Sequence, residues 1–365
     1  MNIKIKFAAL LLSLCSMVSV AQTAISTYTP GISAEGAVYC LPKTAINISI
    51  TTTKTIYVPG ELCQYADRYL RINGISDKEE VAYEITSVAI STAGLPDTKK
   101  LYHILFSANS VAPLVDMSET GILRAINTTA ISSVQEKRDA NVVTESKKEI
   151  GSRPYMTEEM LMAGSKAKLA ELVAKDIYNI RESRNLIIRG QSENIPKDGE
   201  GLKVMLEGLQ EQETALMQLF VGATSTESFT QTYQVVPESG AEKVLLGRFS
   251  RKLGLLHGDD LSGSPIYVDI IDMHSVPTPV EVAEEETKKK KQPKKDVAKQ
   301  DGLVYNVPGR AEVKVYTNTK TLAEESLVLA QFGNTETLSS AFFSKKNNIR
   351  VLLDPVTGAL LKVEE

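Results

Sequence analysis

The chain contains a ten-residue segment that returns near its C-terminal end. Residues 36–45 read GAVYCLPKTA and residues 302–311 read GLVYNVPGRA, with five identities in ten positions. Because self-similarity of this kind indicates a repeated supersecondary unit, we expect two related β units, over residues 36–127 and 302–363. Chance similarity between common turn and strand residues is the alternative interpretation.

A second pair of similar stretches, each running from an Asp to a Gly, follows the first pair. Residues 116–121 read DMSETG and residues 354–358 read DPVTG, and each is followed by apolar residues. Asp, Ser, Thr and Gly are turn residues, so we expect a hairpin turn in each copy, with Gly supplying the positive φ. In the first segment pair, Pro precedes an alternating apolar and polar run, which places it just before a strand.

Alternation and β-branched residues predict strands in both halves of the chain. Residues 45–50 alternate strictly, which indicates one buried and one solvated face. The expected strands cover residues 45–57, 81–90, 101–106, 121–126, 229–236, 244–249, 266–271 and 311–316, with a turn at 94–97.

Helical periodicity is confined to the middle of the chain and one short segment. Residues 62–72 read as a short helix. Thr157, followed by two glutamates, is typical of a helix start, and apolar stripes follow at spacings of three and four residues up to Phe220. Gly190 marks the turn between two helices, and Gly222 is typical of a C-terminal cap. Two amphipathic helices joined by a short loop predict an antiparallel hairpin.

Together these patterns predict an α+β protein with two related antiparallel β units and a central helical hairpin. The expected organisation is a signal peptide (1–21), an N-terminal β-rich domain (22–130), a linker (131–152), the helical hairpin (153–223) and a C-terminal β-rich domain (224–365). A charged flexible loop is expected at residues 281–299, where glutamate and lysine blocks adjoin. The two β units either pack together across the helices or form separate sandwiches.

The N-terminus has the pattern of an export signal. Lys4 and Lys6 precede an apolar run, and small residues stand before Gln22, as at a cleavage site. An N-terminal anchor that is never cut is the alternative. No later apolar run is long enough for a membrane span, so we expect no transmembrane segment once the signal is removed. The expected location is the periplasm, or an association with the outer membrane.

Charge and cysteine content limit the classes of partner. The formal net charge is −4, which becomes −6 without the two signal lysines, so nucleic acid is not an expected partner. Two cysteines remain after cleavage, Cys40 and Cys63. In an oxidising compartment they form a disulfide if their Cα atoms come within bridging range; otherwise they are two small buried apolar residues.

The sequence contains no organised catalytic constellation. It has no nucleophile elbow, no zinc-binding His pair, no P-loop and no dinucleotide fingerprint, so we predict no catalytic residues and no cofactor. Asp259 and Asp260, in a Gly-containing loop, are the candidate metal ligands, although such residues are also ordinary in a strand connection. Tyrosines outnumber phenylalanines, 13 to 8, which keeps glycan binding as an alternative to core packing.

Several segments carry a family resemblance. YVPG at 57–60 with CQYADRYL at 63–70, RPYMTEE at 153–159, and GLVYNVPGR at 302–310 resemble an exported family of Bacteroidota, domain of unknown function 4831. The resemblance covers nearly the whole chain after the signal. It implies a Gram-negative envelope location but no activity and no site residues. The family pattern is not associated with the two cysteines, so it does not imply a disulfide between them.

The sequence therefore favours a non-enzymatic, exported structural or interaction protein. Its partner is unknown and is either an envelope protein or a glycan. A glycan-binding or carbohydrate-active envelope protein is the alternative.

Overall fold

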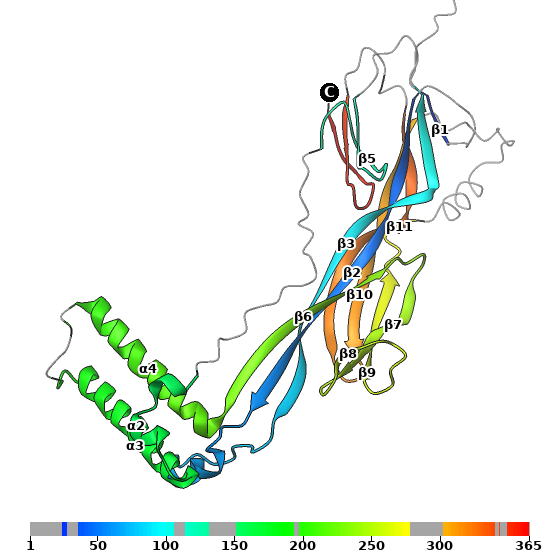
Figure 1. Cartoon of the computed structure of the whole chain (residues 1–365). Helices are drawn as coiled ribbons and strands as arrows, with labels where there is room; N and C mark the ends of the chain where they lie inside the picture. Colours follow the sequence, from blue (N-terminus) through cyan, green and yellow to red (C-terminus); the bar gives the residue numbers. More distant parts are fainter. Residues whose placement is uncertain are drawn as a thin grey trace, which may run out of the picture.

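The computed structural model describes residues 24–27, 36–105, 114–130, 151–192, 196, 198–277, 302–339, 343 and 349–364. Figure 1 shows an elongated molecule, with three β-sheets along most of its length and helices at one end. The signal peptide (1–21), nearly all of the linker (131–150) and the charged loop (281–299) lie outside the described residues.

Strands dominate the described part of the chain. They are β1 (Ala24–Thr27), β2 (Gly36–Val58), β3 (Glu80–Leu105), β4 (Val115–Met117), β5 (Leu123–Ile126), β6 (Ala223–Val235), β7 (Ala241–Ser250), β8 (Gly254–Leu256), β9 (Ser264–Asp272), β10 (Gly302–Thr317), β11 (Thr321–Ser339), β12 (Arg350–Leu353) and β13 (Leu360–Glu364). The helices are η1 (Cys63–Tyr65), α1 (Ala66–Leu70), η2 (Arg153–Tyr155), α2 (Glu158–Leu161), α3 (Lys166–Ile188) and α4 (Gly199–Val221).

The strands form three antiparallel sheets. Sheet 1 has the order β1-β3-β2-β6, sheet 2 the order β11-β10-β9-β7-β8, and sheet 3 the order β13-β12-β5-β4. Sheet 1 contains β6 from the C-terminal half, and sheet 3 joins β4 and β5 to β12 and β13. The N-terminal and C-terminal β regions therefore share sheets, and they do not stand as separate sandwiches.

The predicted turn at residues 94–97 is wrong, because β3 continues through it. β3 pairs with β2 along almost its full length, and the register shifts where Cys40 pairs with Leu101 and Pro42 pairs with Pro96. The extra residues of β3 form a bulge, which bends the strand without ending it. Gly94 allows close packing and does not form a turn, because a Cβ at this position would overlap the carbonyl oxygen of Pro355.

The two similar segments occupy comparable places in the sheets. Each segment begins a long strand: β2, which pairs with β3, or β10, which pairs with β11. In both pairs the register shifts close to the Pro of the segment. Cys40 and Asn306, which stand at the same position of the segment, each form a parallel bridge to the residue after a Gly, Ile122 and Ala359 respectively. The backbone N–H of Cys40 donates to Gly121, and that of Asn306 donates to Gly358.

Sheets 1 and 2 pack face to face over an apolar core. β2 contributes Ile46, Ile48 and Ile50, while residues 47 and 49 between them face away from the core, as the alternation predicted. β9 contributes Ile266, Val268 and Ile270, and β10 adds valines from the same sheet. Burying several fully enclosed aliphatic side chains, each at about 1.5–3 kcal/mol, holds this body together.

A second core lies where the ends of β2, β3 and β10 meet sheet 3. Its largest members are Tyr39, Leu41, Leu123, Ile126 and Leu353. The Tyr39 hydroxyl lies 3.3 Å from the carbonyl oxygen of Val304 and 3.2 Å from its amide nitrogen, which ties the start of β2 to the start of β10.

The helices form a separate cluster, which we call the helical tip (η1, α1, η2 and α2–α4). The hairpin was expected to be central, but it is central only in sequence: Figure 1 shows it at the far end of the molecule from sheet 3. Its core joins Leu62 and Ala66 to Ile177, Leu216 and Phe220. The amide of Leu62 donates to the carbonyl of Leu219 at 2.7 Å, which fixes α4 to the loop between β2 and β3.

Candidate functional site

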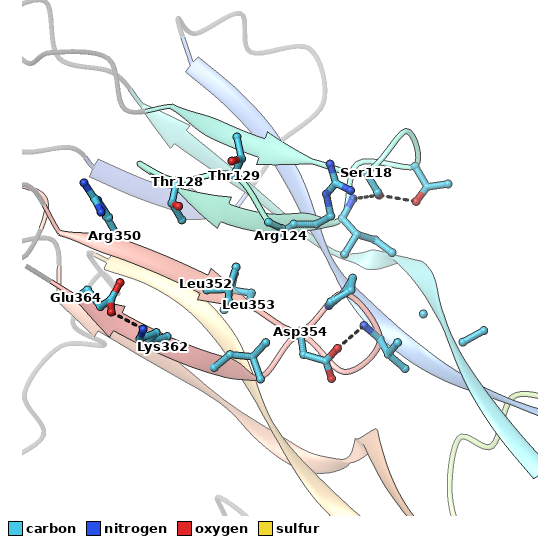
Figure 2. Close-up of a pocket in the computed structure, with 18 residues that line it drawn as sticks. Ser118, Arg124, Thr128, Thr129, Arg350, Leu352, Leu353, Asp354, Lys362 and Glu364 are labelled. Carbon is cyan, nitrogen blue, oxygen red and sulfur yellow. Dashed lines mark hydrogen bonds and ion pairs between the residues drawn. The ribbon is translucent and has the colours of Figure 1, made fainter. Parts of the chain in front are cut away.

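One concave site lies on sheet 3, and we call it the sheet 3 groove. It has a volume of about 660 Å³. In Figure 2, Arg124 and Leu352 lie on neighbouring strands, with Ser118 on one turn and Asp354 on another. The remaining lining comes from β13, from residues 128–130 after β5 and from the bulged part of β3. The groove therefore exists because β5 pairs with β12, two strands more than 220 positions apart.

Three cationic side chains line the groove. Arg124 Nη2 lies 2.6 Å from Asp116 Oδ1, and Asp116 also accepts a hydrogen bond from the amide of Ala130 at 2.8 Å. Lys362 forms an ion pair with Glu364 on β13. Arg350 stands opposite Glu364 in the register of β12 and β13. The cations are thus balanced by carboxylates, so the groove carries little net charge, and apolar side chains such as Leu352 and Val356 also line it.

Two turns close one end of the groove, and they are the echoed Asp-to-Gly stretches. Asp354 Oδ2 accepts from the Thr357 hydroxyl at 2.6 Å, and its Oδ1 accepts from the amide of Val356 at 3.1 Å. Ser118 Oγ accepts from the amide of Ile122 at 3.0 Å. These carboxylate and hydroxyl groups hold turn geometry, with Gly121 and Gly358 at positive φ as predicted.

A buried polar network holds the wall formed by residues 354–358. Asn306 Nδ2 donates to the carbonyls of Thr357 at 2.8 Å and of Pro42 at 3.0 Å. Thr44 Oγ1 donates to the carbonyl of Val356 at 3.2 Å and accepts from the amide of Ala330 at 3.1 Å. Because both side chains are almost fully enclosed, this wall is rigid and preformed.

The groove is equipped for hydrogen bonding more than for proton transfer. The hydrogen bond and positive charge of Lys362, with a further contribution from Arg350, lower the pKa of Glu364, which keeps that carboxylate ionised. A general acid requires the opposite shift. Its described lining includes no His or Cys, and four Ser or Thr hydroxyls lie beside the cations. The chemistry favours a polar, hydroxyl-bearing ligand or a protein segment.

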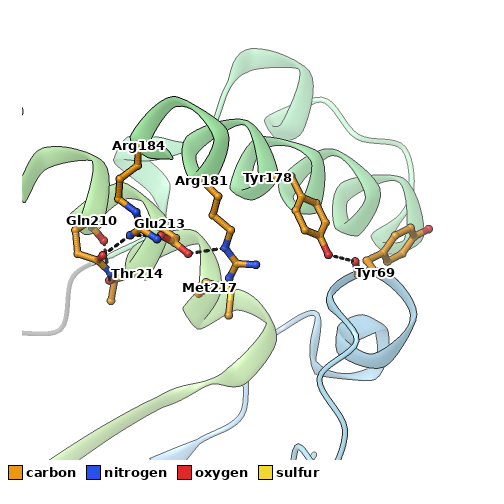
Figure 3. Close-up of polar contacts among 8 residues, drawn as sticks. All are labelled: Tyr69, Tyr178, Arg181, Arg184, Gln210, Glu213, Thr214 and Met217. Atoms are coloured by element: carbon orange, nitrogen blue, oxygen red, sulfur yellow. Dashed lines mark hydrogen bonds and ion pairs between the residues drawn. The ribbon is translucent and has the colours of Figure 1, made fainter. Parts of the chain in front are cut away.

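The helical tip contains a second polar arrangement, shown in Figure 3. Glu213 on α4 lies between two arginines of α3: Arg181 Nε is 2.7 Å from Oε1 and Arg184 Nη1 is 2.8 Å from Oε2. Gln210 accepts from Arg184 at 2.5 Å. Since Glu213 is buried, this cluster fixes how α3 and α4 pack against each other. The groove beyond it, lined by Ile188, Leu202 and Leu206, is apolar.

The candidate metal ligands do not converge on a site. Asp259 is almost fully exposed, and its nearest ionic partner is His257 Nδ1, 3.1 Å from Oδ2. Asp260 Oδ1 accepts from the amide of Ser262 at 2.9 Å; this bond, with the Ser262 side chain, lowers the pKa of Asp260. No group of three or more metal-ligating side chains occurs within the described ranges. The two aspartates shape the connection between β8 and β9.

The cysteines do not form the disulfide considered from the sequence, because both are free. Cys40 is near the start of β2 and Cys63 follows its end. The intervening part of β2 spans about 60 Å at 3.3 Å per residue, far beyond bridging range. The alternative interpretation expected both to be buried: Cys40 is, and burial raises the pKa of its thiol, whereas Cys63 is only partly buried.

Sequence reasoning did not identify the groove residues. Arg124, Arg350 and Lys362 stand in unremarkable strand sequences, and only long-range pairing brings them together. One signal pointed to the place: the echoed Asp-to-Gly stretches, which were expected as turns, form two walls of the groove.

The comparisons with known proteins identify a family. The family model called domain of unknown function (DUF4831) matches residues 35–361, so the chain belongs to this family, as the resemblance indicated. Neither a curated protein nor a solved structure matches the chain. Within the described residues, no helix has the length and apolar character needed to cross a membrane.

Proposed function

We propose that this member of the DUF4831 family is an exported, non-enzymatic structural or interaction protein of the bacterial envelope. The observation that carries the proposal is the spacing of two of its concave surfaces. The sheet 3 groove lies at one end of the β body, and the helical tip, which contains the apolar groove, lies at the other end, as the positions of β5 and α4 in Figure 1 show. A molecule of this form suits two contacts at a fixed separation better than one reaction centre.

The groove supports binding over catalysis. Its carboxylates are occupied: Asp354 holds a turn, and Glu364 is paired with Lys362. Glycoside hydrolysis needs two carboxyl groups with different protonation states flanking the bond. A lowered pKa at Glu364 opposes the role of the general acid in such a pair.

The proposal also includes the relation between the two β units. We infer that β2–β5 and β10–β13 are related copies, since both begin at an echoed segment and continue through a long bulged hairpin to a short hairpin in sheet 3. Two copies whose short hairpins join in one sheet produce a stiff body, which a spacer between two contacts requires.

A photo-crosslinking experiment in intact cells tests the interaction role. A crosslinking residue at Leu361, 59% exposed at the sheet 3 groove, should capture one envelope component reproducibly. The same residue at Leu261, 80% exposed in the β8–β9 connection, is the matched control and should not. The proposal fails if the purified chain turns over an envelope substrate and loses that activity on mutation of a defined acid pair.

Export itself predicts that the protein purified from cells begins at Gln22, and an intact Met1 would contradict it.

Glycan binding is a second candidate, favoured by one observation. Tyr267 and Tyr316 lie on adjacent strands of sheet 2 with ring centroids 5.8 Å apart. Each alternates with buried core residues, so both face outward, beside Leu245, which is 40% exposed. Tyr316 donates to Asp269 at 3.0 Å. An aromatic pair with polar neighbours is suited to stacking on a sugar face.

Titration with soluble peptidoglycan fragments and an oligosaccharide panel tests this candidate. Binding that is lost in Tyr267→Ala and Tyr316→Ala but kept in Tyr178→Ala would support it. Tyr178 is the matched control, because it is 47% exposed on the helical tip. Equal loss in all three variants, or no binding to any glycan, would count against it.

A further inference from the structure

The edges of the three sheets differ in how they are protected from pairing with another chain. Four edge strands are very short: β1 has four residues, β4 and β8 three each, and β13 five. The long edge strand β11 carries three glutamates and two register shifts, and it is tied to sheet 1 through Gln331 and Thr44. β1 covers only residues 102–105 of β3, and the uncovered part of β3 has Pro96, Lys99, Lys100 and two register shifts. Short length, charge, bulges and covering contacts are the devices by which proteins block edge pairing.

The remaining edge strand, β6, has none of these devices. It has 13 residues and pairs with β2 at every position without a register shift. It contains no Pro and no Lys, and its one charged residue, Glu227, is 3.8 Å from Lys54 of β2. In the described part of the chain, no backbone hydrogen bond reaches its outer side. A long, regular edge with a single charged residue is a template for strand addition.

The orientation of the β6 backbone shows which groups are available. Thr52 Oγ1 lies 3.4 Å from the carbonyl oxygen of Phe229, so that carbonyl points toward β2. Backbone N–H and C=O groups alternate in direction along a strand. The backbone groups of the even-numbered residues of β6 therefore point away from β2 and are free to pair with another strand. These residues are Thr224, Thr226, Ser228, Thr230, Thr232 and Gln234.

The strand is complementary to itself. Phe229 is its central residue and is 50% exposed. In an antiparallel pair of two β6 strands centred there, Phe229 meets Phe229 of the second copy in a non-hydrogen-bonded pair, the arrangement that brings side chains closest. Ser228 then faces Thr230 of the second copy, and both have their backbone groups directed outward.

Charge and side-chain type agree with this register. Glu227 faces Gln231 of the second copy, so no like charges oppose each other. On the other face, Ser49–Thr232 and Thr51–Thr230 hydroxyl pairs already run across β2 and β6, at 2.9 and 3.0 Å. Pairing Thr226 with Thr232 of the second copy extends that row of hydroxyls.

We propose that two copies of this chain associate through β6, antiparallel about Phe229, so that their four-stranded sheets become one continuous sheet. The contact is symmetric, with the same residues on both sides, as in most closed homodimers. Hydrogen bonds from the outward backbone groups provide the pairing, and the Phe229 pair fixes the register.

A charge-swap experiment tests the register. Phe229→Glu and Phe229→Lys each place like charges opposite each other, so each variant alone should dimerise at least about tenfold more weakly by sedimentation analysis. A mixture of the two should restore the dimer, which a folding defect would not do. Val328→Glu, at a 43% exposed site on β11, is the matched control and should dimerise normally. A dimer that survives both single variants would overturn the proposal.

A backbone experiment tests the edge itself. Thr230→Pro removes an outward N–H without removing a hydrogen bond to β2, so dimerisation should be lost while thermal unfolding of the monomer stays near that of the wild type. Gln231→Pro removes an inward N–H and should lower the melting temperature instead. Amide exchange at Thr230 should slow as protein concentration rises. A chain that stays monomeric at high concentration, whether its β6 amides exchange rapidly or slowly, contradicts the proposal.

Discussion

The β body and the helical tip are stabilised over different distances along the chain. In the body, the core between sheets 1 and 2 joins residues such as Ile48 and Val313, which lie far apart in sequence. In the tip, α3 and α4 pack against each other across a short connection, with only the segment around Leu62 added from outside. A cluster that depends mainly on local contacts can open without the rest of the molecule. We therefore expect body variants to unfold the whole chain and tip variants to affect mainly the helices.

The largest expected effect comes from the body. Ile48 is fully buried in the core between sheets 1 and 2. Ile48→Ala should lower the free energy of unfolding by about 4 kcal/mol, because the lost methyl groups leave a cavity that strands on both sides cannot fill. Denaturant titration followed by circular dichroism should show strand and helix signals lost together. Val328→Ala is the exposed control, and a comparable loss there would contradict the assignment of the core.

The buried ion cluster of the tip should have a smaller and more local effect. Glu213→Ala leaves Arg181 and Arg184 without their shared carboxylate, and both arginines keep partial access to water. We expect a loss of about 2 kcal/mol in the stability of the α3–α4 pair. Amide exchange should accelerate in α3 and α4 but not in β10. Equal acceleration in both regions would mean that the tip and the body form one cooperative unit.

The same contrast explains how far the sequence could predict the structure. The helical tip follows from local signals: Thr157 accepts from the amide of Met160 as an N-cap, the apolar stripe including Ile177 is buried, and Gly222 ends α4 at positive φ. The body follows from pairing between distant strands, to which local patterns give no direct access. The alternation in β2 showed which face is buried, but nothing local showed that β6 would pair with β2.

The groove was hidden from the sequence for the same reason. The cationic side chains of the groove come from β5, β12 and β13. Within its own strand, each looks like an ordinary residue that faces away from the core. The bulge in β3 was mistaken for a turn, because Gly94 and Pro96 carry the composition of a turn. Gly94 instead allows the close approach of the turn at residues 354–358, and Pro96 pairs with Pro42 of β2. Interactions across sheets decide such positions, and these interactions are absent from any short window of sequence.

A tyrosine in the body should make its stability depend on alkaline pH. Burial raises the pKa of Tyr39 well above its ordinary value of about 10, and its bond to Val304 opposes this only in part. A folded-state pKa above the unfolded one means that the neutral form is stabilised below pH of about 10 and that stability falls as pH rises beyond it. Tyr39→Phe should lose about 1 kcal/mol at neutral pH, through the missing hydrogen bond to Val304.

The decline of stability between pH 9 and 11 should be shallower in Tyr39→Phe than in the wild type. Denaturant midpoints measured across this range give the comparison directly. Identical slopes in the two proteins would show that Tyr39 is not the group responsible. Because the tip does not contain Tyr39, amide exchange in α3 should be unchanged by this substitution at neutral pH.

The smallest expected effect tests the independence of the tip most sharply. Asp198 caps α4, with Oδ2 accepting from the amide of Gly201 at 2.7 Å. Asp198→Ala should cost about 0.5–1 kcal/mol, since it removes that bond and a negative charge from the positive end of the helix. Asp198→Asn keeps a capping oxygen and should recover most of the loss. If the tip opens separately, the change should appear as faster amide exchange in the first turns of α4, with no shift in the denaturant midpoint of the strands. A shift in the denaturant midpoint of the whole protein would instead show that loss of this cap destabilises the body as well, through the hydrogen bond between Leu62 and Leu219. The body and the tip would then unfold as one unit.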